Sequence, residues 1–409
     1  DQESAFSINT DFLVMANHKF GKFGIDGMIG GTINYRQNSN VWGATQNGLS
    51  IPGFYSLNAS VDPAATGQGF SKKQVNSIYG KATLSWESML FVDVTARNDW
   101  SSSLPESTRS YFYPSVASSL VLSEIWDMPE YIDLLKIRGS WTKTKNDIGV
   151  YETNNVYSLS TNVWNGLNAA YYPSTIRGVD LRPESSRSYE LGIAANFLKN
   201  RVWGDITYYN KVYYDAAIQA PISDATGFSS TYLNSEEETV RRGVEITLGG
   251  VPVKTPEFEW NAMFNWSLDR SYYKKLDPKY SSKYPWVKEG NRTDVVTSGF
   301  IWDTDSEGNI VHGADGLPVS LNELGFMGYS TPDWIWGFSN SFKYKEFTLD
   351  ISFDGCVGGV IYNRTEQSMW HSGAHIDSDN QWRYDEVVNG KKNYIGQGVK
   401  VVSGTIERD

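Results

Sequence analysis

The sequence lacks long apolar runs, and this limits how the chain could cross a membrane. Nowhere in its 409 residues do about 18 apolar residues follow one another, which is the length that a transmembrane helix needs. A membrane protein with this sequence would therefore cross the bilayer with β-strands. Cysteine is almost absent as well. Cys356 is the single cysteine, so no internal disulfide can form, and we expect it to be a small residue of a strand.

Positive charge is also scarce. Lys and Arg number 36 against 47 Asp and Glu, which gives a net charge of -11, and no cluster of Lys or Arg stands out along the chain. A nucleic-acid partner would favour a basic face, so the composition argues against one. Aromatic residues are abundant: 25 Tyr, 15 Trp and 18 Phe accompany a mean hydropathy of only -0.42. This combination is typical of half-apolar strands joined by long polar loops.

Short stretches of alternating apolar and polar residues recur along the chain. The clearest runs from Phe347 to Asp354, where four apolar residues alternate with Thr, Asp, Ser and Asp. Such a strand has one apolar and one polar face, and its length suits a tilted strand that crosses a membrane. Repetition of the pattern predicts about twelve antiparallel strands. The first two, at 7–15 and 25–37, alternate least regularly; the other clear stretches are 90–97, 135–142, 190–197, 241–248 and 258–269.

The connections between these strands are alternately short and long. The short ones lie at 21–24, 87–89, 199–200, 255–257 and 344–346, with a slightly longer one at 124–133. The long ones lie at 38–72, 100–110, 146–185, 221–237, 275–332 and from 363 onward. Short periplasmic turns alternating with long extracellular loops are the pattern of an outer-membrane β-barrel, and Trp and Tyr near the strand ends suit its two interfaces. The alternative from another class is a surface all-β carbohydrate-binding module, in which a second sheet would cover the apolar face.

Several segments of the chain resemble one family of transporters. The longest reads TARNDWSSSLP at 95–105 and is followed by SYFYPS at 110–115. Further segments follow in the family's order: LKIRGSW at 135–141, LRPE at 181–184 with SYELG at 188–192, DITYYN at 205–210, RGVE at 242–245 and PDWIWGF at 332–338. Through these motifs the chain resembles the SusC/RagA family of TonB-dependent outer-membrane transporters of Bacteroidetes.

The resemblance implies a barrel of about 22 strands whose lumen is closed by an N-terminal plug. It implies import of an oligosaccharide or a peptide across the bacterial outer membrane, driven by the TonB complex through the plug. A SusD-like surface lipoprotein would act as a lid, in a dimer of transporter–lipoprotein pairs surrounded by lipid and lipopolysaccharide. We expect residues 1–409 to be part of this barrel, without the plug and the last strands, and to begin and end at extracellular loops. A siderophore or cobalamin receptor and a passive porin are the alternatives among barrels.

The candidate site residues are aromatic side chains of the long loops and charged side chains of the polar strand faces. Flat rings stack on the apolar faces of sugars or on peptide side chains. Substrate contacts are therefore predicted, with loop packing or lipoprotein contact as the alternative, at Trp164, Tyr171, Tyr172, Trp286, Trp302 and Trp370. The residues expected to face the lumen or to contact the plug are Asp93, Arg97, Asp99, Lys136, Arg138, Asp350 and Asp354.

The sequence shows no catalytic constellation and no cofactor motif, so we expect neither an enzyme nor a metal site. His371 and His375 have the spacing of zinc ligands on a helix, but the residues between them indicate a loop, and no Glu follows the first His. The segment from Asp303 to Asp315 resembles half of a calcium loop. Because Ala314 occupies its twelfth position, a plain loop that turns at 307–308 is favoured over a calcium site.

Overall fold

In the computed structural model, antiparallel β-sheet dominates the chain. The structure describes residues 1–159, 165–167, 169–178, 180–313, 317–390, 399–402 and 405–408. They divide into two compact units. The first comprises residues 1–291 and 336–355, and the second comprises the described residues of 292–335 and 356–409. None of the described helices is long and apolar enough to span a membrane.

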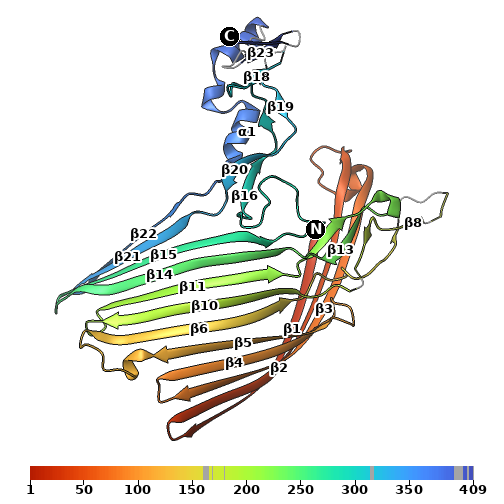
Figure 1. The fold of residues 1–409 in the computed structure, drawn as a ribbon. Coiled ribbons are helices and arrows are strands. Elements are labelled where there is room, and N and C mark those ends of the chain that lie inside the picture. The colour runs from red at the N-terminus through yellow and green to blue at the C-terminus, as the bar shows by residue number, and fades with distance from the viewer. Residues whose placement is uncertain are drawn as a thin grey trace. The chain divides into compact units, whose positions relative to one another are not determined.

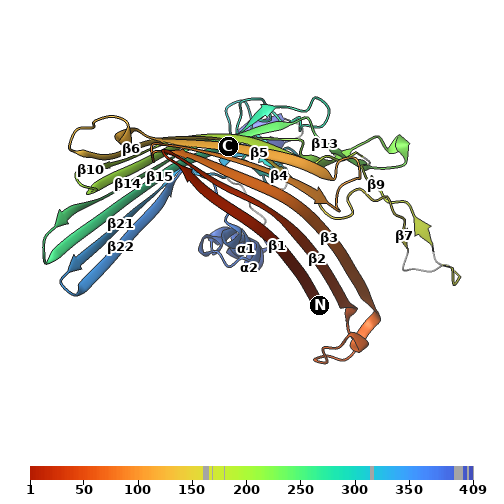
Figure 2. The ribbon, with the colours of Figure 1, turned by 90° about the horizontal axis from the view of Figure 1, so that it is seen from below.

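The first unit is built on one curved sheet of twelve strands (Figures 1 and 2). Each strand pairs with the next of the series, so that β1 and β22 form the two edges of the sheet. This arrangement confirms the predicted all-β fold and the predicted number of strands. The strands are β1 (Gln2–Phe20), β2 (Phe23–Leu49), β3 (Ser60–Trp86), β4 (Leu90–Ser101), β5 (Ser110–Val121), β6 (Ile132–Asn146), β10 (Glu184–Phe197), β11 (Val202–Tyr214), β14 (Glu238–Lys254), β15 (Phe258–Lys275), β21 (Trp334–Tyr344) and β22 (Phe347–Val357).

The short connections predicted from the sequence are tight turns in the structure. Between β1 and β2, Gly21 has a φ of 58°, and between β21 and β22, Lys345 has a φ of 52°. Left-handed residues of this kind give a turn the twist of the strands that it joins. The longer link between β5 and β6 carries a 3₁₀ turn, η2 (Leu122–Glu124). We call the opposite end of the sheet, from which the long connections leave, its loop end.

The strands of the first two hairpins are much longer than the sequence predicts. A loop is predicted at 38–72, but β2 and β3 pair as far as Leu49 and Ser60, which leaves a loop at 50–59 that contains η1 (Leu57–Ala59). Polar residues occupy both faces of this extension. The alternation of apolar and polar residues therefore could not reveal that it continues the strands. The backbone hydrogen bonds between the two strands form regardless of which side chains flank them.

Short strands add two small sheets to the long connections of the first unit. In one, β13 (Ser230–Asn234) lies between β12 (Ala217–Pro221) and β9 (Thr175–Ile176). In the other, β7 (Ser158–Leu159) pairs with β8 (Ala170–Tyr171). A 3₁₀ turn, η3 (Asp224–Thr226), joins β12 to β13.

The second unit combines small sheets with two short helices. Its paired strands are β16 (Val295–Ser298) with β20 (Gly325–Tyr329), β17 (Ile301–Trp302) with β19 (Ser320–Leu321), and β18 (Val311–His312) with β23 (Val399–Val402) and β24 (Thr405–Arg408). The helical elements are α1 (Arg364–Ser372), η4 (Ile376–Ser378) and α2 (Gln381–Asn389).

The loop predicted around His371 is wrong, because this residue lies in α1. The side chain of Asn363 caps the start of the helix by accepting a hydrogen bond from the backbone N–H of Glu366. Gly373, with a φ of 71°, ends it. Both are standard helix boundaries, and they outweigh the small polar residues that follow, which favour a loop in the sequence. His375 lies beyond the helix and caps η4.

Large apolar side chains remain exposed over one face of the twelve-stranded sheet. On β10, Leu191 is 59% exposed and Ile193 is 53% exposed, and on β22 Leu349 is 58% exposed. These residues belong to the apolar face predicted from alternation. A surface of this kind does not suit contact with water and marks a site of membrane or protein contact.

Candidate functional site at the loop end of the sheet

Asp99 is the centre of a buried polar cluster at the loop end of β4. Its carboxylate accepts hydrogen bonds from Arg97 Nε and from the Tyr113 hydroxyl, each at 2.7 Å. Arg97 also donates to Ser77 Oγ at 2.9 Å. Because Asp99 is only 5% exposed, these charge-assisted bonds replace the water that it loses. The sequence predicts that Arg97 and Asp99 face the lumen or the plug, and the structure pairs the two with each other.

Asp147 is a second carboxylate that joins separate segments at this end of the sheet. It forms an ion pair with Lys73 of β3 at 2.7 Å and accepts a hydrogen bond from Ser101 Oγ. Ser101 is 1% exposed and lies 3.0 Å from the hydroxyl of Ser103. The serine-rich part of TARNDWSSSLP is therefore a buried anchor. Sequence reasoning missed Asp147, because nothing in the long loop around it marks one acid as an anchor.

An apolar cluster joins the SSSLP and LRPE motifs. It consists of Leu104, Tyr111, Ile148 and Leu181, with Tyr113, Ala217 and Tyr232 packed against it. Leu181 is 2% exposed, and its carbonyl oxygen accepts a hydrogen bond from Thr108 Oγ1 at 2.6 Å. The two motifs thus form one packed base beneath the loops, although the family resemblance treats them as separate signatures.

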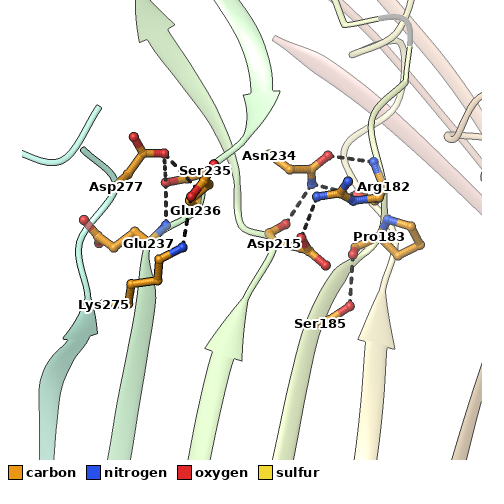
Figure 3. Close-up of polar contacts among 10 residues, drawn as sticks. All are labelled: Arg182, Pro183, Ser185, Asp215, Asn234, Ser235, Glu236, Glu237, Lys275 and Asp277. Atoms are coloured by element: carbon orange, nitrogen blue, oxygen red, sulfur yellow. Dashed lines mark hydrogen bonds and ion pairs between the residues drawn. The ribbon is translucent and has the colours of Figure 1, made fainter. Parts of the chain in front are cut away.

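The LRPE motif also ties β10 to the loop that follows β11 (Figure 3). Arg182 forms an ion pair with Asp215 at 2.7 Å. The Asn234 side chain accepts a hydrogen bond from the Arg182 backbone N–H at 2.8 Å and donates to the Asp215 carbonyl oxygen at 2.8 Å. One amide therefore holds two chain segments together, because a side-chain amide can accept and donate at once.

Asp277 anchors the next loop in the same way (Figure 3). It is 4% exposed and accepts hydrogen bonds from Ser235 Oγ and from the backbone N–H groups of Glu236, Lys279 and Tyr280. Burial raises the pKa of Asp277, but these hydrogen bonds outweigh it and the pKa lies below its ordinary value. The polar clusters around Asp99, Asp147 and Asp277 thus form a base at the strand ends that holds the start of each loop in place.

The structure gathers some of the predicted substrate-binding aromatics of the first unit. Tyr172 lies 4.6 Å from Tyr157 and 6.2 Å from Phe228, measured between ring centroids. We call these three residues the aromatic trio. Tyr172 is 66% exposed and Tyr157 is 57% exposed, so their rings can contact a ligand. Neighbouring Tyr171 is exposed as well. Sequence reasoning missed Tyr157 and Phe228, since they come from different parts of the chain and no spacing relates them to Tyr172.

The other aromatic candidates form separate pairs. Trp286 stacks on Tyr284 at 5.1 Å in the first unit. In the second unit, Trp302 lies edge-on to Phe300 at 4.9 Å, and Trp370 stacks on His375 at 4.3 Å. Trp164 lies outside the described residues.

The charged residues predicted to face the lumen lie together on the polar face of the sheet. Arg138 forms a two-pronged ion pair with Asp205, at 2.6 and 2.7 Å, and Asp93 pairs with Lys81 at 2.9 Å. A cavity of about 170 Å³ opens between Asp93, Arg138 and Glu190. Lys136, Asp350 and Asp354 share this face by alternation.

The segment considered for calcium binding forms a turn around Asp305. Asp305 accepts hydrogen bonds from the backbone N–H groups of Glu307 and Asn309, at 2.8 and 2.9 Å, as in the turn favoured from the sequence. Ala314 and Asp315 lie outside the described residues. In the described part of the chain, no group of three or more His, Cys, Asp or Glu side chains is placed to hold a metal ion.

Comparison with known proteins identifies the family. The model of the TonB dependent receptor-like, beta-barrel family matches residues 2–393. TonB-dependent receptor P3 of Formosa agariphila is 24% identical over 352 residues, which are 76% of this chain and 35% of that protein. TonB-dependent receptor SusC of Bacteroides thetaiotaomicron is 23% identical over 321 residues, which are 70% and 31%. The chain thus spans about a third of the length of these relatives, whose names describe receptors and not enzymes.

Solved structures show the same fold. The RagAB peptide transporter has a TM-score of 0.71 at 18% identity, over 87% of this chain and 42% of that one. The outer membrane transporter YddB of Escherichia coli has a TM-score of 0.52 at 12% identity, over 89% and 44%. The chain therefore belongs to the TonB dependent receptor-like β-barrel family of the bacterial outer membrane, in agreement with its SusC/RagA motifs.

Proposed function

We propose that this chain forms part of the wall of a SusC-like transporter that imports an oligosaccharide or a peptide with energy from the TonB complex. The observation that carries the proposal is the sheet itself, which has an exposed apolar face, a charged opposite face and a fixed base for long loops. The apolar face would contact lipid, and the charged face would line the lumen. No soluble binding module needs an apolar face of this extent.

In this proposal the loops capture the cargo and the polar face guides it. Tyr157 and Tyr172 of the aromatic trio offer exposed rings that suit stacking on sugars or on apolar peptide side chains. The cavity between Asp93, Arg138 and Glu190 offers charge of both signs, which suits contact with a plug or with passing cargo. Residues 1–409 would be one part of a larger barrel, with the plug and the TonB contact in other parts of the protein.

A surface lipoprotein of the SusD type is the proposed partner. It would cover the loops that stand on the base around Asp99, Asp147 and Asp277, and the complex would be a dimer of transporter–lipoprotein pairs. The hydrogen-bonded base of the loops supports this assignment, because loops that bind a partner protein need their ends held in place. Trp286, Trp302 and Trp370 are further candidates for contact with cargo or with this partner.

Uptake by cells that produce the full-length transporter and its lipoprotein tests the proposal. Labelled oligosaccharides and peptides are offered to cells with and without a working TonB complex. We expect uptake of one of these classes, its loss without TonB, and about a fivefold loss of affinity for Tyr172→Ala, since one stacking ring contributes about 1 kcal/mol. Tyr55→Ala is the matched control, because Tyr55 is 89% exposed and lies in another loop. Uptake without TonB would indicate a passive porin, and binding of a ferric siderophore or cobalamin alone would indicate the other receptor class.

A further inference from the structure

The first three strands extend beyond the neighbouring strand β4 at the loop end of the sheet (Figure 1). β3 pairs with β2 from Ser60 onward but with β4 only from Val75 onward. The segments beyond the end of β4 are 2–8 of β1, 35–49 of β2 and 60–74 of β3. We call these segments the arm. Their two faces continue the two faces of the sheet.

One face of the arm continues the polar face of the sheet. Asp99 on this polar face is directly opposite Ser77 of β3, which is directly opposite Thr32 of β2. Every second residue of β2 after Thr32 therefore shares this face, and Glu3 of β1 joins it because it is directly opposite one of them, at position 40. We call five of these side chains the inner strip: Glu3, Arg36, Asn38, Asn40 and Trp42.

The side chains of the inner strip are exposed and unpaired, whereas those that precede them on the same face have partners. Asn34 donates a hydrogen bond to Asn9. Lys73, which is directly opposite Arg36, forms an ion pair with Asp147 at 2.7 Å. Within the described residues, none of the five side chains of the inner strip forms a hydrogen bond or an ion pair. Their polar groups are therefore available to a ligand.

Two glycines of β3 leave room for the inner strip. Gly67 is directly opposite Trp42, and Gly69 is directly opposite Asn40. A Cβ at Gly67 would lie 2.7 Å from Cζ2 of Trp42, and a Cβ at Gly69 would meet the side-chain amide of Asn40. The indole and the amide thus lie across the backbone of β3, and Trp42 remains 41% exposed. Glycine in a strand often marks a place where a ligand or another backbone comes close.

The spacing of the two amides suits an extended peptide. Side chains on one face of a strand repeat about every 6.8 Å, and an extended peptide that lies along the strand has the same repeat. A side-chain amide can accept a hydrogen bond from a peptide N–H and donate one to a peptide carbonyl oxygen at the same time. Asn38 and Asn40 thus match two peptide groups of the same orientation, two residues apart.

The charges of the inner strip suit the two ends of a short peptide. Arg36 lies at one end of the strip, and Glu3 lies beside Asn40. Arg36 and Asn40 are four residues apart on β2, which is about 13 Å and about the length of five extended residues. A guanidinium group binds a carboxylate in a two-pronged geometry, and a carboxylate binds an ammonium group. An oligosaccharide without an amino group would offer no cation to Glu3.

We propose that the inner strip binds a short peptide of about five residues in an extended conformation. Its C-terminal carboxylate lies at Arg36, its backbone on Asn38 and Asn40, and its N-terminal ammonium group at Glu3. Trp42 packs against a side chain near the N-terminus of the peptide. The inference rests on the proposed function, and within it selects a peptide over an oligosaccharide as cargo.

Binding of pentapeptide mixtures to the purified full-length transporter tests the proposal. Three mixtures of random sequence are compared: one with free ends, one with an amidated C-terminus and one with an acetylated N-terminus. Mass spectrometry measures the peptides that stay bound. We expect each blocked end to weaken binding about fivefold, which is near the largest effect of one exposed ion pair.

Two variants separate recognition of the peptide ends from a general effect on folding. Arg36→Gln should bind free and amidated peptides equally and should still prefer a free N-terminus. Glu3→Gln should bind free and acetylated peptides equally and should still prefer a free C-terminus. A change that only disturbed the arm would not remove one preference and keep the other.

A third variant tests the amides. Asn38→Ala with Asn40→Ala should weaken binding of all three mixtures about tenfold, since it removes several hydrogen bonds to the peptide backbone. The matched control is Thr66→Ala with Gln68→Ala, because both side chains are exposed on the other face of the same arm, and it should leave binding unchanged. Heat-modifiable migration on gels checks that every variant is folded.

Four results would overturn the inference. They are failure to retain any pentapeptide, equal binding of free and blocked peptides, retention of an oligosaccharide that the double Asn variant abolishes, and loss of the partner lipoprotein from this variant with peptide binding unchanged. TonB-dependent uptake of oligosaccharides alone would also overturn it but would leave the proposed function standing. Uptake that does not need TonB would instead contradict the proposed function.

Discussion

The hydroxyl group of Tyr113 donates a hydrogen bond of 2.7 Å to the carboxylate of Asp99. Tyr113 belongs to SYFYPS on β5, and Asp99 belongs to TARNDWSSSLP on β4. The bond therefore joins two motifs that the sequence shows only as neighbours in order. Asp99 also holds Arg97, so one buried acid fixes the exit of the chain from β4 and its return on β5.

Replacing this acid should cost more than replacing its phenol partner. Asp99→Ala leaves both Arg97 and Tyr113 without their acceptor, and we expect a loss of about 2–3 kcal/mol in the free energy of unfolding. Tyr113→Phe removes one hydrogen bond and should cost about 1 kcal/mol. Urea unfolding of the full-length protein from lipid vesicles measures both. Equal losses for the two variants would show that Asp99 does not organise the cluster.

Leu181 should control how firmly the loop at 146–184 is held. Leu181→Ala opens a cavity in the apolar cluster and should cost about 2–5 kcal/mol. Limited proteolysis of the folded protein should then cut this loop faster, with the strands of the sheet still protected. Leu167→Ala in the same loop is the control, because Leu167 is 72% exposed. If both variants were cut at the same rate, the cluster would not anchor the loop.

The second unit should lose stability in acid through Asp294. Burial raises the pKa of Asp294, but hydrogen bonds from Arg292 and Thr331 outweigh it and hold the pKa at about 2. This is below the value of about 3.9 in an unfolded chain, so the stabilisation is complete above that value and is lost as pH falls from about 4 to about 2. Hydrogen exchange of the backbone amides of 292–335, corrected for its intrinsic pH dependence, measures this loss of stability. Asp294→Asn should abolish this loss of stability between about pH 4 and about pH 2. If the Asn variant still lost stability over this range, Asp294 would not be its cause.

The glycine of the RGVE motif should be required for strand pairing. A Cβ at Gly243 would lie 2.6 Å from the Tyr209 hydroxyl and even closer to the carbonyl oxygen of Leu268, so neighbouring backbone would have to shift. We expect Gly243→Ala to cost about 1–3 kcal/mol and to lower the yield of folded barrel in the outer membrane. Gly299→Ala is the control, because its Cβ would meet open space. An undiminished yield for Gly243→Ala would contradict the geometry.

The sequence predicts the sheet well because alternation and tight turns are local signals. Phe347 to Asp354 alternates strictly and forms most of β22, and the turn at Lys345 lies where the pattern breaks. The extension of β2 and β3 could not be predicted, since polar residues on both faces leave no alternation. Helix α1 was not predicted either, because its composition resembles that of a loop. A capping Asn and a terminating Gly define the helix in spite of this composition.

The candidate site was less predictable, because it depends on residues brought together over long distances in sequence. The family motifs contain Asp99 and Leu181 but do not reveal that both are buried at one base. Asp147 and Asp277 carry no local sign that they anchor loops. The partners of Tyr172 lie on other segments, and Glu3 meets Asn40 only through the pairing of β1 with β2.

Labelling of single cysteines on β22 of the assembled full-length protein tests whether one face of this sheet contacts lipid and the other contacts water. In a Cys356→Ser background, Leu349→Cys, Ile351→Cys and Phe353→Cys should resist a membrane-impermeant maleimide, while Asp350→Cys, Ser352→Cys and Asp354→Cys should react. Fluorophores at the first three positions should be quenched by brominated lipid chains, and those at the other three should not. Equal labelling of both sets, or the reverse alternation, would show that the apolar face of β22 does not contact lipid.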